Sequence, residues 1–200
     1  MQKANKGIQI EDLLSQINIG ENVPIELSQK LTPLTLKKNK DFVSFNEPMN
    51  KIGVLFKGLL IAKYFDEKGD EYVSKFYYPE GDYLVVDFNA FKKKEKTKER
   101  IYAFEDSILM VISRHDYFEI KEKNPDISRL SNLLAEESYL KALERIRTLQ
   151  KTCNKEKIKK FKSEHSAIMS KLNLKDIASY LGMSRNIYAK NLKEIEDRTI

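Results

Sequence analysis

The sequence predicts an α+β protein, in which an N-terminal antiparallel β domain is followed by one long helix and a small C-terminal helical domain. Short apolar runs separated by turn residues recur from residue 31 to residue 115, and apolar residues at helical spacing follow from residue 124 onward. Two shorter helical patterns around a glycine come after them. We therefore expect one domain over 1–123, a linking helix over 124–152 and a second domain over 153–200.

The β domain is indicated by apolar and aromatic runs spaced about ten residues apart. The expected strands lie within 42–45, 52–65, 72–78, 83–88 and 107–112. Turn residues separate the runs, among them Lys57-Gly58, Gly69-Asp70 and Gly81-Asp82. Several short strands at this spacing are typical of an antiparallel barrel or sandwich. Ahead of them, apolar residues over 8–18 predict a short helix.

The composition is that of a protein with a packed core, because 41% of the residues are hydrophobic and 33% are charged. No apolar run approaches the roughly 18 residues needed to cross a bilayer, and the N-terminus has no signal-peptide core. The one cysteine, Cys153, excludes an internal disulfide and a CxxC redox pair. We therefore expect a cytoplasmic protein with no membrane partner and no cofactor.

The net charge of +6 lies entirely in the last quarter of the chain. Residues 1–150 contain 24 Lys and Arg against 24 Asp and Glu, whereas residues 151–200 contain 12 against 6. Cations collected on a small segment are typical of a module that binds phosphates. A lysine-rich tail that only keeps the chain in solution would show the same bias.

A long amphipathic helix is predicted after Asn124-Pro125-Asp126. Apolar residues recur at steps of three, four and seven as far as Leu149, which corresponds to ~35 Å at 1.5 Å per residue. Such a stripe is longer than one small domain covers, so we expect it to pair with a second copy of itself. The residues predicted at this dimer seam are Ile127, Leu130, Leu134, Leu140 and Leu143. The alternative is a helix packed wholly on its own β domain.

The segment from Asn173 to Ile195 has the pattern of a helix-turn-helix. Asn173 is a suitable N-cap for a first helix, Gly182 can end that helix at positive φ, and Ser184 can cap a second. One face of the first helix carries Leu174, Ile177, Ala178 and Leu181, and the buried face of the second is expected at Tyr188, Leu192 and Ile195. This arrangement is typical of DNA-binding proteins, although a generic helical hairpin has the same apolar spacing.

The other face of the second helix is predicted to enter the major groove of double-stranded DNA. The predicted DNA-contacting residues are Ser184, Arg185, Asn186, Ile187, Ala189, Lys190 and Lys193, with Lys162 expected on a phosphate. Arg185 can donate two N–H groups to guanine O6 and N7, Asn186 matches adenine N6 and N7, and Ile187 can contact a thymine methyl. Two such helices in a homodimer predict an inverted-repeat operator.

Several segments along the chain match the sequence pattern of one known family. They are Pro79 with Gly81-Asp82, Glu105-Asp106-Ser107 through Ile112-Ser113, Asn124-Pro125-Asp126, Asp176-Ile177-Ala178, and Gly182-Met183-Ser184-Arg185. On these residues the chain resembles the Crp/Fnr family over nearly its whole length. The resemblance implies a cyclic-nucleotide-binding-like β-roll (a double-stranded barrel) for a small effector, a dimer, and a transcription regulator rather than an enzyme. It also implies that Arg185, Asn186 and Lys190 contact base edges, and it makes RNA polymerase a candidate partner.

The effector site departs from the members of that family that bind cyclic nucleotides. Those members carry a Gly-Glu pair for the ribose hydroxyl and an Arg-Ser/Thr-Ala motif for the cyclic phosphate. Here Val85-Val86 stands at the first position, and Thr97-Lys98-Glu99 lies near the second. Without that carboxylate and that arginine, we expect no response to a cyclic nucleotide. The residues expected around an unidentified small-molecule effector are Gly81, Asp82, Val85, Val86, Thr97 and Lys98.

Other interpretations of the β domain stay open. It could belong to a cyclic-nucleotide-responsive or a ligand-independent member of the same family, or to a cupin-like barrel that binds a small molecule. A cupin metal site needs an HxH pair with a Glu and a further His. The two histidines, His115 and His165, are far apart and are predicted to be ordinary surface residues, so neither a metal site nor haem ligation is expected.

A lysine-rich run extends from Lys92 to Lys98. It is predicted to be a solvated, mobile loop. The alternative is that its cations lie at the mouth of the barrel, where they receive an anionic effector or touch flanking DNA.

Overall fold

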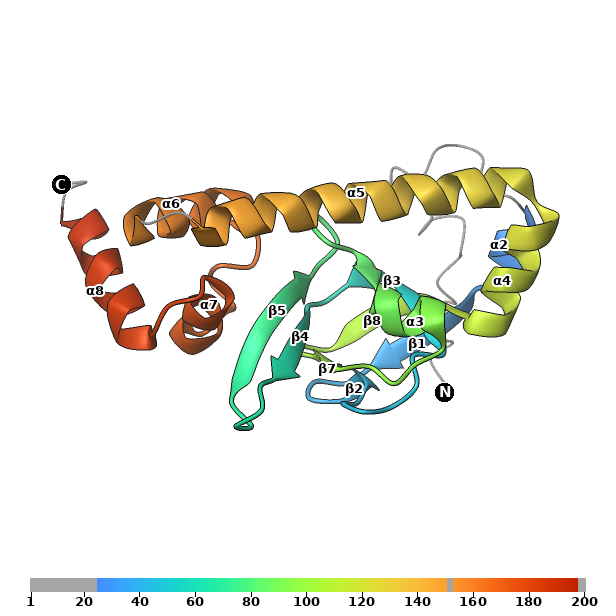
Figure 1. The fold of residues 1–200 in the computed structure, drawn as a ribbon, viewed down its shortest axis with the longest axis horizontal. Helices are drawn as coiled ribbons and strands as arrows, with labels where there is room; N and C mark the ends of the chain where they lie inside the picture. The colour runs from blue at the N-terminus through green and yellow to red at the C-terminus, as the bar shows by residue number, and fades with distance from the viewer. Residues whose placement is uncertain (1–24, 151–152, 198–200) are drawn as a thin grey trace, which may run out of the picture.

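The computed structural model describes residues 25–150 and 153–197, so the helix predicted over 8–18 lies outside the described residues. Figure 1 shows a β-roll beneath one long helix, with a group of shorter helices at the C-terminal end of that helix. Within the two described ranges, no helix is both long and apolar enough to span a lipid bilayer.

The β-roll consists of two four-stranded sheets with antiparallel pairing. One sheet contains, in spatial order, β1 (Thr32–Leu36), β8 (Ser107–Ser113), β3 (Lys51–Lys57) and β6 (Leu84–Val85). The other contains β2 (Asp41–Val43), β7 (Glu99–Ala103), β4 (Leu60–Phe65) and β5 (Glu71–Tyr77). Leu55, Leu60, Ile101 and Leu109 are fully buried in the core of the roll. The predicted α+β class and the antiparallel β domain are therefore confirmed.

Some strand boundaries differ from the predicted ones, because contacts with residues far away along the chain determine them. The run predicted over 52–65 is two strands, because Gly58 breaks it at a φ of +106°. A Cβ at that position would lie 2.2 Å from the Ser107 hydroxyl oxygen, so only glycine fits. The run over 83–88 yields only the two residues of β6 before the helix α3 (Phe88–Lys93) begins. The sequence did not indicate β1, in which polar residues interrupt the apolar ones, or β7, which begins with the charged Glu99 and Arg100.

The lysine-rich run is predicted to be one loop, but its first residues belong to the helix α3. Lys92 and Lys93 form the last turn of α3, and Lys94 caps it in the left-handed region at a φ of +61°. Lys92 through Lys96 are exposed, as expected of a solvated segment, but Thr97 is buried. The run is therefore anchored at both ends.

Three helices lie where the chain enters and leaves the β-roll. They are α2 (Ile25–Lys30) before the first strand, and α4 (Arg114–Lys123) and α5 (Pro125–Gln150) after the last. The helix α5 confirms the long helix that the sequence predicts. Figure 1 shows α5 running from the roll to the C-terminal helices. Ile127 at its start is only 2% exposed and belongs to the core of its own roll. The prediction that Ile127 lies at a dimer seam is therefore wrong, because its own chain already covers it.

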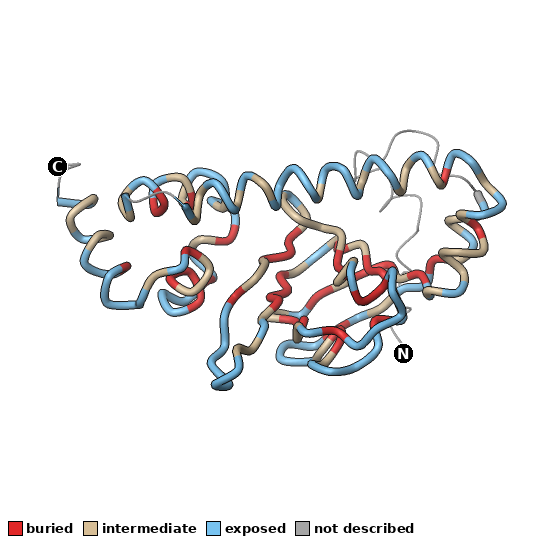
Figure 2. The backbone as a smooth tube through the Cα atoms, in the orientation of Figure 1, coloured by how far each residue is buried: buried red, intermediate tan, exposed pale blue. Residues whose placement is uncertain are grey.

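The C-terminal domain shares a second core with the outer face of the roll. Its helices are α6 (Asn154–Glu164), α7 (Leu174–Tyr180) and α8 (Arg185–Glu196). The shared core includes Ile61, Val73 and Phe76 from β4 and β5, and Phe161, Ile177 and Tyr188 from the helices. Figure 2 shows buried residues of α7 and of the neighbouring strands on facing sides. The Val73 N–H also donates to the Ser179 hydroxyl oxygen at 2.9 Å, so α7 is docked on the edge strand β5.

Candidate nucleic-acid interface and an interdomain cleft

Local hydrogen bonds build the helix-turn-helix formed by α7 and α8. The Asn173 side chain accepts from the Asp176 N–H at 2.8 Å and caps α7. Gly182 has a φ of +66°, the left-handed conformation that ends the first helix and turns the chain. The Ser184 hydroxyl oxygen accepts from the Ile187 N–H at 3.2 Å and caps α8. The predicted roles of these caps and of the glycine turn are confirmed.

The second helix of the motif has one buried face and one exposed face. Tyr188 is completely buried, and Leu192 and Ile195 pack partly buried against the same core. The seven residues predicted on the opposite face are all exposed, namely Ser184, Arg185, Asn186, Ile187, Ala189, Lys190 and Lys193. Ile187 is 44% exposed, which leaves its methyl groups free for an apolar contact outside the chain.

The cations of this domain differ in their partners. Lys162 lies 3.5 Å from the Glu196 carboxylate, which partly neutralises it. Arg185, Lys190 and Lys193 on the exposed face of α8 form no ion pair with any residue that the structure describes. Uncompensated positive charge therefore lies on the face that the sequence predicts for the DNA groove.

The region predicted to hold an effector inside the roll is filled by its own side chains. Val85, Val86 and Thr97 are at most 5% exposed, whereas Lys98 is exposed. The Asp87 carboxylate accepts from the Thr97 hydroxyl at 2.7 Å and from two N–H groups in the first turn of α3. A helix N-terminus can bind an anion through such N–H groups. In α3 a carboxylate of the chain itself already occupies them.

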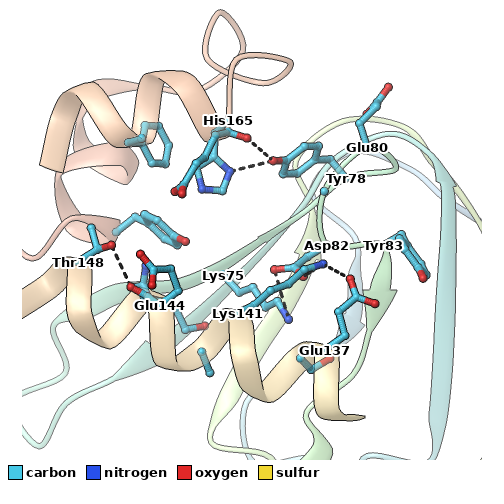
Figure 3. Close-up of a pocket in the computed structure, with 18 of the residues that line it drawn as sticks. Lys75, Tyr78, Glu80, Asp82, Tyr83, Glu137, Lys141, Glu144, Thr148 and His165 are labelled. Atoms are coloured by element: carbon cyan, nitrogen blue, oxygen red, sulfur yellow. Dashed lines mark hydrogen bonds and ion pairs between the residues drawn. The ribbon is translucent and has the colours of Figure 1, made fainter. Parts of the chain in front are cut away.

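A cleft of about 920 Å³ lies where the roll meets α5 and the C-terminal helices. Its lining comes from β5 and the turn that follows, from the C-terminal half of α5, and from α6 and α7 (Figure 3). Gly81 and Asp82, which the sequence places at an effector site, line this cleft. A Cβ at Gly81 would lie 2.2 Å from the Tyr78 ring, so glycine allows the turn to fold close to that tyrosine.

One wall of the cleft is a network of ion pairs centred on Asp82 (Figure 3). The Asp82 carboxylate lies 3.5 Å from the Lys75 Nζ and 3.2 Å from the Lys141 Nζ. Lys141 also pairs with Glu137 at 2.7 Å. Two cations and two carboxylates thus compensate one another on this wall.

The opposite wall carries His165, which is not the ordinary surface residue that the sequence predicts. Its Nδ1 lies 2.9 Å from the Tyr78 hydroxyl oxygen, and aromatic rings of β5, α6 and α7 surround the imidazole. Burial lowers the pKa of His165 to about 4 and raises the pKa of Tyr78 to about 12. Both groups are therefore neutral near pH 7. The sequence offers no signal for this pair, because the two residues are far apart along the chain.

The neutral imidazole makes folding stability depend on pH. The unfolded chain takes up a proton on His165 near the ordinary pKa of 6.5, and the folded chain does so only at about 4. We expect the free energy of unfolding to fall as the pH drops from 6.5 toward 4, because the unfolded state binds more protons there. Denaturant unfolding across this range should show a weaker pH dependence for His165→Gln. The exposed His115 on α4 is the control, so His115→Gln should retain the full dependence. Identical pH dependence in the two variants would contradict the burial of His165.

Solved structures match the chain although no family model and no curated protein does. FixK2 from Bradyrhizobium japonicum is 14% identical over 85% of this chain and 86% of its own, with a TM-score of 0.73. A transcriptional regulator of the Crp/Fnr family from Eubacterium rectale is 16% identical over 93% and 87%, with a TM-score of 0.69. A CooA mutant from Carboxydothermus hydrogenoformans is 16% identical over 93% and 84%, with a TM-score of 0.67.

These matches establish the architecture. The chain has the fold of Crp/Fnr-type transcription regulators, with a cyclic-nucleotide-binding-like β-roll, a long helix and a C-terminal helix-turn-helix. At such low identity the similarity shows the fold alone, so the function has to be argued from the residues of this chain.

Proposed function

We propose that this protein is a homodimeric, sequence-specific DNA-binding transcription regulator of the Crp/Fnr type. The observation that carries the proposal is the exposed face of α8, on which three cations lack a carboxylate partner in the described chain. The face begins at a capped helix N-terminus and rests on the buried Tyr188, so its side chains are presented by a rigid element. Such a face suits the major groove of double-stranded DNA.

The dimer is supported by the outward face of α5. Lys141 and Arg145 point to the cleft of their own chain, and an apolar set lies on the other side of the helix. Tyr139 is 63%, Leu140 57% and Ile146 50% exposed. A single chain rarely leaves such a patch in water, and a second α5 related by a two-fold axis would cover it. Of the residues predicted at the seam, Leu140 is exposed, and Leu130, Leu134 and Leu143 are partly buried.

The regulator is further proposed not to respond to cyclic nucleotides. The support is the filled interior around Val85 and Val86 and the Asp87 carboxylate at the start of α3, which would repel a cyclic phosphate. The two histidines also lie outside the roll, one on α4 and one in the cleft, so they do not form the ligand set of a cupin. RNA polymerase is a candidate partner of the DNA-bound dimer.

The test is selection of preferred sequences from random double-stranded DNA with the purified full chain. We expect an inverted repeat whose half-sites are separated by about one helical turn, ~34 Å. We also expect the binding constant to fall steeply as the salt concentration rises, because cations on the protein displace counterions from phosphates. Recovery of no enriched sequence, together with affinity that depends on salt but not on sequence, would overturn the proposed function.

A further inference from the structure

We propose that the interdomain cleft binds a small organic anion and that Arg145 holds the carboxylate or phosphate group of this ligand. The cleft has the size of a small-molecule site, since such sites typically measure about 300–1,000 Å³. Its lining residues come from both the roll and the C-terminal domain, so a ligand there would contact both domains at once. The proposal concerns binding at this cleft alone and stands independently of DNA binding.

Arg145 is the cation of the cleft that the chain leaves without a carboxylate. Lys75 and Lys141 are both paired with Asp82. The Arg145 guanidinium instead lies 3.7 Å from the centre of the Tyr180 ring and donates to the Val73 carbonyl oxygen at 3.3 Å. None of the ion pairs in the described ranges includes it. A guanidinium has five N–H donors in a planar fork that matches a carboxylate or a phosphate.

The acidic residues that line the cleft are largely compensated. Glu144 pairs with Lys160 and lies 3.5 Å from Arg147, and Glu164 lies 3.6 Å from Lys160. Figure 3 shows Glu80 pointing away from the cleft, toward solvent. No carboxylate of the described chain forms an ion pair with Arg145, which interacts electrostatically with Glu99 on β7.

Aromatic side chains also line the cleft beside Arg145. Tyr78, Tyr180 and His165 line it, and burial keeps the imidazole neutral by lowering its pKa to about 4. The Tyr78 hydroxyl lies 2.9 Å from the His165 Nδ1 and donates to the Glu164 carbonyl oxygen at 3.2 Å, so both rings are held in place and neither carries a charge near pH 7. The chemistry therefore fits a molecule with one anionic group and an apolar or planar body.

The histidines provide a direct test. Only two are present, and His165 lines the cleft while His115 is exposed on α4. The full-length protein would be titrated separately with inorganic phosphate and with succinate, at constant neutral pH and ionic strength, and followed by NMR of the imidazole rings. We expect at least one probe to shift the His165 signals saturably and to leave His115 unchanged. The probe that saturates identifies the anionic group as phosphate or carboxylate.

Two variants of α5 assign the effect to the guanidinium. Arg145→Gln is expected to lower the affinity for the saturating probe by about tenfold or more, because a charged hydrogen bond is lost. Arg129→Gln is the matched control, because Arg129 is exposed on the same helix and does not line the cleft; its affinity should equal that of the wild type. The proposal is overturned if neither probe produces a saturable His165 shift in the wild-type protein. It is also overturned if a folded Arg145→Gln variant binds with unchanged affinity.

Discussion

Replacing Arg185 by alanine is expected to cost about 1–3 kcal/mol of binding to the selected operator and to relax the preference for a guanine. Arg185 is exposed in the first turn of α8, and no residue of the described chain neutralises it. Its guanidinium can donate two N–H groups to guanine O6 and N7, which is the commonest specific contact in the major groove. Quantitative binding to operators that differ at this base pair measures the effect. An Arg185→Ala protein with unchanged affinity and unchanged base preference would remove Arg185 from the base edge.

The residue next to Arg185 is expected to determine the preference at a second base pair. Asn186 is exposed beside Arg185, and its amide matches adenine N6 and N7. Exposed Ile187 can contact the methyl group of thymine. We therefore expect half-sites that contain a guanine next to an A·T pair, and Asn186→Ala should lose the A·T preference. If Asn186→Ala keeps that preference, another residue reads this base pair.

Lys162 provides the control for these two substitutions. It is predicted to meet only a phosphate, and in the free protein it lies 3.5 Å from Glu196. Lys162→Ala should therefore weaken all DNA sequences to a similar extent and make the salt dependence shallower. A base-specific loss in Lys162→Ala would show that α6 takes part in sequence recognition.

Placing a positive charge on the outward face of α5 is expected to abolish the dimer. Leu140→Lys puts an ammonium group at a position that is 57% exposed in the single chain, so the folded chain should tolerate it. In a dimer that ammonium would be buried against a second copy without a partner, which is strongly unfavourable. Since two half-sites then bind independently, affinity for the full operator should fall by about 100-fold or more.

Sedimentation of the wild type and of two variants measures this effect. The control is Ala167→Lys, which adds the same charge at an exposed position after α6, away from the α5 face, and should remain dimeric. A wild-type protein that sediments as a monomer at micromolar concentration would contradict the dimer. A dimeric Leu140→Lys protein would place the seam on another surface.

The helix-turn-helix could be predicted in detail because local interactions determine it. The Asn173 and Ser184 caps bond to N–H groups three residues away, and the left-handed turn depends on Gly182 alone. The exposed and buried faces of α8 follow from helical periodicity. Such information lies within one or two turns of the chain, so the sequence by itself determined this motif and the long helix before it.

The tertiary structure decided the features that depend on residues far apart along the chain. Ser107 determines that Gly58 divides one apolar run into two strands, and the core of the roll covers Ile127. Tyr78 and its aromatic neighbours turn His165 from a surface residue into a partly buried, neutral one. The cleft around Arg145 forms only when α7 docks on β5. Each of these depends on burial and on contacts across the fold, and periodicity along the sequence contains neither.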